Sequence, residues 1–180
     1  MKGNKGFSLV EVIVVIAVMA VLTGVVAPQF IKYCEKANVS ADTQYCDTVR
    51  SAFMLMLSDP KFSANDNLDS TSKFLVTELT TPGRSGNFSV YSIGGTNFAA
   101  YDFINEIVGT DVFTATSGQY FKSSPARSSG ILSYKVSDEG ILYIFINNSD
   151  NTGSKIGHSV NSSSPMSDYN ELICVPVVCE

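Results

Sequence analysis

The sequence predicts an α+β protein in which a long N-terminal α-helix packs on a small antiparallel β-sheet head domain. An apolar run from Phe7 to Ala27 leads into a stretch whose apolar residues recur at spacings of three and four, which indicates one long helix. Further along, two short apolar segments flank the Gly-containing turn from Ser137 to Gly140, which is typical of a β-hairpin. A long helix followed by a mixed region and then by antiparallel strands favours the α+β class.

The apolar run is long enough to cross a membrane. Phe7 to Ala27 is 21 residues, and a helix needs about 20 to span a bilayer. Lys2 and Lys5 precede the run, and cytoplasmic flanks are enriched in Lys and Arg, so we expect the leader to be cytoplasmic and the bulk of the chain to lie outside. Glu11 lies inside the apolar segment, where a carboxylate costs about 2.5–3.5 kcal/mol on insertion scales. Glu11 is therefore a candidate functional residue.

The periodicity predicts one helix from Ser8 to Ser58, roughly 75 Å long at 1.5 Å per residue. Its first part is apolar all round and favours lipid or other helices, whereas its second part is amphipathic and favours the chain's own domain. Asp59-Pro60 ends the pattern because the residue before a proline is pushed out of the helical region. Pro28 removes a backbone hydrogen bond and predicts a kink, and Gly24 weakens the same turn.

Short elements separated by polar loops are expected in the rest of the chain. The predicted elements are a helix at Thr71–Leu79 capped by Asp69 or Ser70, a strand at Phe88–Ile93, a helix at Asn97–Val108 with Gly109 as its C-cap, a hairpin of Ile131–Val136 and Ile141–Ile146, and a strand at Leu172–Val178. The predicted loops or turn-rich segments are Lys61–Ser70, Thr81–Asn87 and Asn147–Asp168. Pro176 argues for an edge position or a bulge in the last strand.

A short motif, Gly6-Phe7-Ser8-Leu9-Val10-Glu11, stands at the head of the apolar run. It combines a glycine, a phenylalanine and a glutamate four residues after that phenylalanine. Together with the run, the stretch from Lys5 to Pro28 resembles the class III signal of type IV pilins and related pseudopilins. Pro28 falls where many members of that family have a proline. The resemblance implies cleavage after Gly6 by a membrane prepilin peptidase and N-methylation of Phe7.

The motif and the helical pattern together predict four segments. These are a leader peptide at residues 1–6, a transmembrane or filament-core helix at 7–29, an amphipathic second half of the same helix at 30–58 and a globular head domain at 59–180. An ordinary secretory signal is cut after its apolar core, whereas the cut implied here precedes the run, so the span would be kept.

The resemblance also implies a function. We expect a structural subunit of a type IV pilus, inserted in the cytoplasmic membrane as a precursor and then polymerised into an extracellular filament. Its expected partners are further copies of the chain in a helical filament, the prepilin peptidase, the pilus assembly machinery of the cytoplasmic membrane, and membrane lipid before assembly.

Glu11 has a role in this resemblance. After cleavage Phe7 carries a free, methylated and cationic amine, and Glu11 lies one helical turn further on. An unpaired charge in a low-dielectric filament core is costly. The resemblance therefore implies that Glu11 neutralises the amine of its own chain or of a neighbour and helps to set the stagger between subunits.

The composition restricts other functions. The formal net charge is −5, and loss of Lys2 and Lys5 with the leader makes the mature chain more acidic. Nucleic-acid binding requires a clustered basic face, which scattered Lys and Arg do not provide. The part of the chain outside the apolar span could bury one domain core but not two.

Four cysteines, Cys34, Cys46, Cys174 and Cys179, leave the disulfide pattern open. Cys34 and Cys46 are about 18 Å apart along one helix, beyond the reach of a disulfide. The alternatives are a local Cys174–Cys179 bond, one bond from Cys46 to the C-terminal segment, or free buried thiols. Many pilins close a C-terminal loop with a disulfide, usually around a longer segment.

No catalytic, cofactor or metal site is expected. His158 is the only histidine and lies in a Ser-rich tract without an orienting acid. Zinc is disfavoured because the chain has no CxxC motif. Calcium oxygens could come from Asp138-Glu139-Gly140 or from Asp150 to Gly153, but neither has EF-hand spacing and both are ordinary turn sequences.

Two alternatives to a pilus subunit remain. One is a pseudopilin of a type II secretion or competence (DNA uptake) system, and the other is a membrane-anchored enzyme or binding domain. The second would require a polar constellation in the head domain, which the sequence lacks. Long polar loops suit a displayed surface and favour the pilus subunit.

Overall fold

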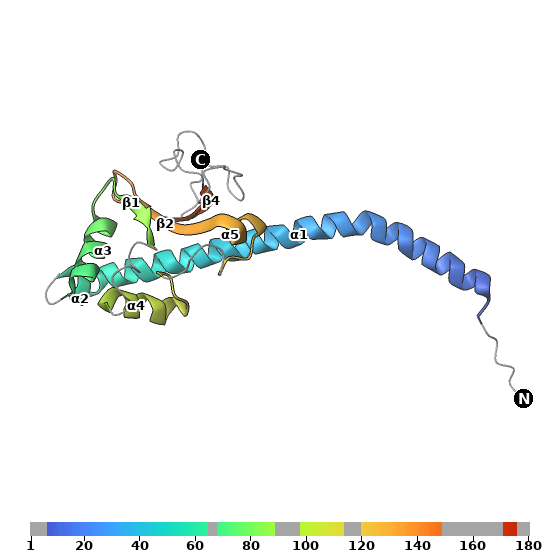
Figure 1. Ribbon diagram of the computed structural model, residues 1–180, viewed down its shortest axis with the longest axis horizontal. Coiled ribbons are helices and arrows are strands. Elements are labelled where there is room, and N and C mark those ends of the chain that lie inside the picture. The colour runs from blue at the N-terminus through green and yellow to red at the C-terminus, as the bar shows by residue number, and fades with distance from the viewer. Residues whose placement is uncertain (1–6, 65–67, 89–97, 114–119, 149–170, 176–180) are drawn as a thin grey trace, which may run out of the picture. The chain divides into compact units, whose positions relative to one another are not determined.

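The computed structural model describes residues 7–64, 68–88, 98–113, 120–148 and 171–175 (Figure 1). Contacts divide the chain into two compact units, Met1–Ala37 and Asn38–Glu180. Helix α1 (Leu9–Ser58) contributes residues to both units. The predicted long helix is confirmed to within one residue at its start, and it ends before Asp59-Pro60 as expected.

The second unit contains a four-stranded antiparallel sheet. Its strands are β1 (Ser85–Asn87), β2 (Gly130–Val136), β3 (Leu142–Asn148) and β4 (Glu171–Val175), in the order β1-β2-β3-β4. The predicted hairpin corresponds to β2 and β3. The α+β class with a long N-terminal helix and a small antiparallel sheet is therefore confirmed.

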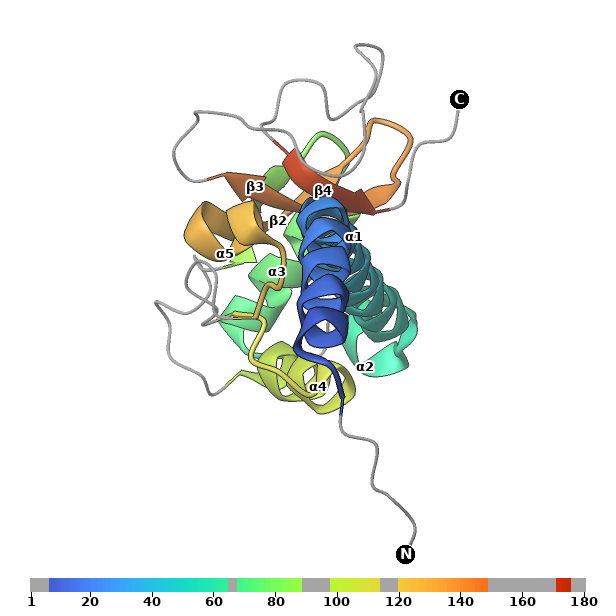
Figure 2. The same cartoon turned by 90° about the vertical axis from the view of Figure 1, so that its right-hand side faces the viewer.

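The core of the second unit lies between this sheet and the second part of α1. In the β2–β3 ladder, Leu132 pairs with Ile146 and Val136 with Leu142, and all four side chains are buried in the same apolar cluster. The second part of α1 adds its own buried stripe: Cys46, Val49, Ala52, Phe53 and Met56. Figures 1 and 2 show the sheet on one side of this part of α1 and α4 on the opposite side. The buried stripe of this part of α1 is thus covered by its own domain, while other residues of the same part, such as Leu55, stay exposed.

Four shorter helices complete the described part of this unit: α2 (Pro60–Ser63), α3 (Ser70–Thr80), α4 (Ala99–Val108) and α5 (Ser124–Ser129). Asp69 is the N-cap of α3, as the sequence predicted. Gly109 ends α4 with φ of 73°, in the left-handed region that glycine adopts without strain.

Several predicted loops are partly regular in the structure. Pro60–Ser63 forms α2 because Asp59 caps it, accepting a hydrogen bond from the Lys61 N–H at 2.8 Å, and proline is well suited to the first helical position. Ser85–Asn87, predicted as turn, pairs with β2, and three residues are too few for an alternating pattern.

The remaining comparisons with the predicted elements concern Phe88, α5 and β4. Phe88 lies outside any strand, while the rest of the strand predicted at Phe88–Ile93 falls outside the described residues. Helix α5 was not predicted. The described residues of β4, Glu171–Val175, lie at the edge of the described sheet, and their pairing with β3 has a register irregularity between Ile146 and Asn147. Edge position and irregular pairing agree with the expectation from Pro176, which itself is outside the described residues.

Candidate assembly site on the N-terminal helix

Phe7 and Glu11 lie at the start of α1. The Ser8 carbonyl accepts hydrogen bonds from the Glu11 and Val12 N–H groups at 3.0 and 3.3 Å, which begins the helix. Phe7 is 83% exposed, and Glu11 is exposed in the first turn. Gly6, the other half of the predicted cleavage junction, is outside the described residues.

Ser8 and Glu11 also have the order of a capping box, a Ser followed three residues later by Glu at a helix start. This spacing is visible in the sequence and is a general signal of a helix start. A carboxylate in the first turn is stabilised by the partial positive charge of the helix N-terminus. Glu11 therefore has a local structural role available in addition to pairing with an amine.

The surface of the first unit carries two shallow grooves along α1. One is lined by Phe7, Glu11, Val12, Val15 and Ile16. The other is lined by Leu22, Thr23, Val26, Ala27 and Phe30. Their walls are apolar side chains at helical spacings of three and four, the geometry that receives side chains of a neighbouring helix. Glu11 is the charged residue among these lining residues.

Pro28 lies inside α1, which remains helical through it. Because proline has no N–H, the Gly24 carbonyl four residues earlier lacks its usual helical donor. In the preceding turn, the Thr23 hydroxyl donates to the Met19 carbonyl at 2.8 Å, a contact that weakens and bends helices. Gly24 has no side chain to stiffen the segment, so three helix-weakening features fall within six residues.

The first part of α1 is long and apolar enough to cross a membrane by length and composition. An 18-residue window has a mean hydropathy of 2.8, and none of it is buried within the structure. A buried core helix of a soluble protein would pass the same test of composition but not this test of exposure.

Comparisons with known proteins agree with the resemblance that the N-terminal motif predicted. Residues 1–27 match the family described as the prokaryotic N-terminal methylation motif. The chain is 29% identical over 116 residues to type IV major fimbrial protein FimA of Dichelobacter nodosus, covering 64% of this chain and 72% of FimA. The N-terminal segment thus matches the methylation-motif family, and the similarity to a fimbrial protein supports the type IV pilin family.

Two further relatives cover less of the chain. Prepilin peptidase-dependent protein A of Clostridium perfringens is 39% identical over 74 residues, which is 39% of this chain and 53% of that relative. Type IV wide pilus major component PilA4 of Thermus thermophilus is 32% identical over 66 residues, which is 36% of this chain and 50% of that relative. The chain thus spans about half the length of these two relatives. No solved structure matches it.

Asp42 of α1 holds a distant segment of the second unit against the helix. Its side chain is 1% exposed, and its two oxygens accept the backbone N–H groups of Lys122 and Ser123 at 2.7 and 2.8 Å. A buried carboxylate is stable only when it is hydrogen-bonded or paired. Here two consecutive amides from the segment before α5 satisfy it, so that segment is held against α1.

Tyr45, one turn after Asp42, adds an aromatic and a polar contact. Its ring meets Phe121 edge to face at 6.1 Å, and its hydroxyl accepts a hydrogen bond from Thr110 at 3.3 Å. Burial raises the pKa of Tyr45 above its ordinary value. One face of α1 thus holds segments of the chain more than 60 residues away.

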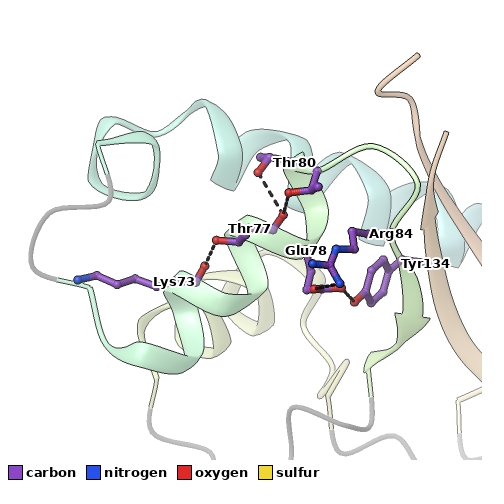
Figure 3. Close-up of polar contacts among 7 residues, drawn as sticks. Lys73, Thr77, Glu78, Thr80, Arg84 and Tyr134 are labelled. Carbon is purple, nitrogen blue, oxygen red and sulfur yellow. Dashed lines mark hydrogen bonds and ion pairs between the residues drawn. The ribbon is translucent and has the colours of Figure 1, made fainter. Parts of the chain in front are cut away.

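A second polar contact joins α3, the residue before β1, and β2. Figure 3 shows Glu78 of α3 next to Arg84 and Tyr134. The Tyr134 hydroxyl donates to Glu78 at 3.2 Å, and the Arg84 guanidinium lies 3.3 Å from the same carboxylate. Gly86 faces Tyr134 across the ladder, and a Cβ there would come within 2.9 Å of the phenol oxygen. These contacts fix the fold and form no recognisable catalytic arrangement.

The other candidates from the sequence give no site. Within the described residues no group of three or more His, Cys, Asp or Glu could hold a metal ion. Asp138-Glu139-Gly140 forms the β2–β3 turn, with Gly140 at φ of 81° and the Gly140 N–H donating to the Ser137 carbonyl at 3.0 Å. A hydrogen bond from Ser137 lowers the pKa of Glu139. His158 and Asp150 to Gly153 lie outside the described residues.

The cysteine alternatives stay predictions. Cys34 is exposed on the first part of α1, whereas Cys46 is fully buried in the core of the second unit. Cys174 lies in β4 opposite Phe145, but its side chain is not described, and Cys179 is outside the described residues.

Proposed function

We propose that this chain is the structural subunit of an extracellular type IV pilus, made as a membrane-inserted precursor and polymerised through α1. The observation that supports this most strongly is the fully exposed apolar window of α1. A helix that is apolar all round requires lipid or other helices on every face. Lipid would cover it in the precursor and neighbouring copies would cover it in the filament.

The proposal assigns a role to each part of the chain. Residues 1–6 are the leader removed by a prepilin peptidase, residues 7–29 the membrane and filament-core helix, residues 30–58 the amphipathic continuation, and residues 59–180 the head on the filament surface. The assembly machinery of the cytoplasmic membrane would move the subunit from one environment to the other. The role is structural, with no reaction catalysed by the subunit itself.

The proposed processing and assembly residues are Gly6, Phe7 and Glu11. Cleavage after Gly6 creates an amine at Phe7, which is then methylated and remains cationic. Glu11 lies one helical turn after Phe7, and both residues line the same shallow groove. In a low-dielectric filament core the two groups would be paired, within one subunit or between neighbours, because unpaired charges there are costly.

Pro28 is proposed to serve assembly through backbone weakness. The missing donor to Gly24 and the Thr23 back-bond are two helix-weakening features in the apolar part of α1. We expect the helix to unwind locally from Gly24 to Pro28 in the filament, which would let it lengthen under packing or tension. Regular helical hydrogen bonds from Leu22 through Phe30 in a filament map would contradict this.

A pilus is favoured over a pseudopilus by the names of two relatives. FimA is a major fimbrial protein and PilA4 a major pilus component. Prepilin peptidase-dependent protein A, whose name refers to processing alone, is compatible with either assembly.

The proposal is tested by shearing filaments from cells and analysing the subunit by mass spectrometry. We expect long surface filaments that contain this chain, with a mature N-terminus at Phe7 that carries one methyl group. Gly6→Val should block processing, whereas Gly6→Ala should permit it, because the junction requires a small residue. Filaments built from chains that still begin at Met1 would overturn the processing proposal, and a short pseudopilus confined to the cell envelope would replace the pilus by the pseudopilin alternative.

A further inference from the structure

The uncharged stretch of α1 is bounded by charged residues on both sides. The twenty residues from Val12 to Ile31 carry no charged side chain and lie between Glu11 and Lys32. At 1.5 Å per residue this length of helix spans about 30 Å, the thickness of a bilayer's hydrocarbon core. The first charges after the stretch therefore fall at the depth of the lipid headgroups, on the side of the membrane away from the N-terminus.

Three residues at this boundary have the chemistry of a headgroup contact. Lys32 and Lys36 are both exposed and lie four residues apart, so they share one face of α1. Tyr33 lies between them in the sequence and is 67% exposed. Tyrosine is enriched at membrane–water interfaces, and lysine extends an apolar stem along lipid while its ammonium reaches the headgroups.

The charge and the apolar surroundings at this boundary favour an anionic lipid. Lys32 and Lys36 outnumber Glu35, which leaves this helical turn with a net positive charge. Phe30 and Ile31, immediately before it, are 64% and 69% exposed and would lie in the acyl chains. The segment therefore passes from the apolar residues Phe30 and Ile31 to the basic and aromatic residues from Lys32 to Lys36, just as acyl chains give way to the headgroup region.

We propose that Lys32, Tyr33 and Lys36 form a binding site for anionic phospholipid headgroups in the extracytoplasmic leaflet and fix the depth of the precursor in the membrane. This rests on the membrane-inserted precursor of the proposed function. Each lysine near an anionic surface strengthens binding about fivefold. Leaving the membrane for the filament would require these lysines to exchange phosphate for other partners.

The chain has no tryptophan, so Tyr33→Trp gives a single fluorescent reporter that keeps an interfacial aromatic residue. The full chain is reconstituted into vesicles of phosphatidylcholine, alone or with phosphatidylglycerol. Tryptophan emission and its quenching by lipids brominated on the acyl chain report the depth of residue 33. We expect bluer emission and stronger quenching in the anionic vesicles, and we expect added salt to reverse the difference.

The same measurement on Lys32→Gln/Lys36→Gln in this background should lose the dependence on lipid charge. Lys61→Gln/Lys73→Gln is the matched control, since it removes two exposed lysines from the second unit. Equal emission in both kinds of vesicle, or a full response retained without Lys32 and Lys36, would overturn the headgroup site while leaving the precursor intact. Failure of the chain to float with vesicles of either composition would overturn the inserted precursor together with this site.

Discussion

The two parts of α1 have the same helical geometry but opposite environments. In the first unit Val15 is 48% exposed and Phe30 64% exposed, whereas in the second unit Phe53 and Met56 are fully buried. The difference follows from the pattern of apolar residues. A stripe can be covered by one sheet, whereas a helix that is apolar all round needs partners on several sides.

Polar contacts separate the two parts as well. The second part holds its domain through Asp42 and through Arg50, whose guanidinium donates to the Leu142 carbonyl at 2.9 Å. In the first part, Thr23 bonds only to the carbonyl of its own helix. Folding of the head should therefore depend on the second part, and assembly on the first, and each can be disturbed without the other.

The largest expected effect is on assembly. Glu11→Leu should leave a stable, inserted and cleaved subunit, and insertion should improve slightly because a carboxylate is removed from the apolar segment. Filament yield should fall sharply because the Phe7 ammonium loses its proposed partner. The measurement is an immunoblot of cleavage beside the yield of sheared filaments from the same cells.

Gln29→Leu is the control for that experiment, because it also replaces an exposed polar side chain of the apolar part of α1 with leucine but removes no charge. It should assemble nearly normally. If Glu11→Leu cells shed as many filaments as wild type, the pairing proposal is wrong, and the capping-box position of Glu11 becomes its main role.

The next effect is on the stability of the head. Phe53 stacks on Phe88 at 4.7 Å and meets Phe113 edge to face at 6.1 Å. Phe53→Ala should lower the free energy of unfolding by about 3–5 kcal/mol because it leaves a cavity in the core. Thermal unfolding of the full chain in mild detergent, followed by near-ultraviolet circular dichroism, measures the loss.

Phe30→Ala makes the same chemical change in the first part of α1, where the ring is exposed. It should leave head unfolding unchanged and reduce filament yield. Equal destabilisation of the head by the two variants would show that the two parts of α1 are not independent.

Asp42 should have an intermediate effect. Asp42→Ala leaves the amides of Lys122 and Ser123 without their acceptor, and each unsatisfied buried group costs about 1–3 kcal/mol. Asp47 is exposed on the same helix, and Asp47→Ala should change stability by less than about 0.5 kcal/mol. The same unfolding measurement compares them, and similar values for both would mean that the contact with Asp42 contributes little.

The sequence alone predicted the elements that depend on local pattern. Apolar spacing predicted α1, and two apolar segments flanking the Gly-containing turn from Ser137 to Gly140 predicted the β2–β3 hairpin. Asp69 and Gly109 marked the ends of two helices because capping is a property of nearest neighbours.

Contacts between distant residues could not be predicted in this way. From the helical pattern alone, Asp42 would be expected to face solvent. Only the fold brings the Lys122 amide, 80 residues away in the sequence, to its carboxylate. Glu78 and Tyr134 meet across 56 residues for the same reason. Phe7 and Glu11 were proposed from the motif, and the neighbouring subunits with which they could also pair are not contained in one chain.

The smallest predicted effect concerns Asp69 and its dependence on pH. One oxygen of Asp69 accepts the Ser72 N–H at 2.7 Å, and the other accepts the Ser72 hydroxyl at 2.7 Å and the Ala99 N–H at 3.0 Å. The Ser72 hydroxyl oxygen also accepts the Ala100 N–H at 3.0 Å. One carboxylate thus caps α3 and holds the start of α4.

Burial alone would raise the pKa of Asp69, but the hydrogen bonds from Ser72 and Ala99 outweigh it and lower the pKa below its ordinary value. The unfolded chain therefore binds a proton more readily than the folded chain does. The contribution of Asp69 to stability is complete above the unfolded pKa of about 4 and is lost as the pH falls through the lower folded pKa.

Asp69→Asn keeps one acceptor but turns an N–H donor towards the Ala99 amide, so it should cost about 1 kcal/mol at neutral pH. The gap between wild type and variant should shrink below about pH 4, because protonation removes the same carboxylate from the wild type. Ser72→Ala, which removes one donor to Asp69, should flatten the acid dependence only in part. Unfolding midpoints of the three chains between about pH 7 and about pH 3 measure this. A gap that stays constant over that range would mean that Asp69 acts by shape and not by charge.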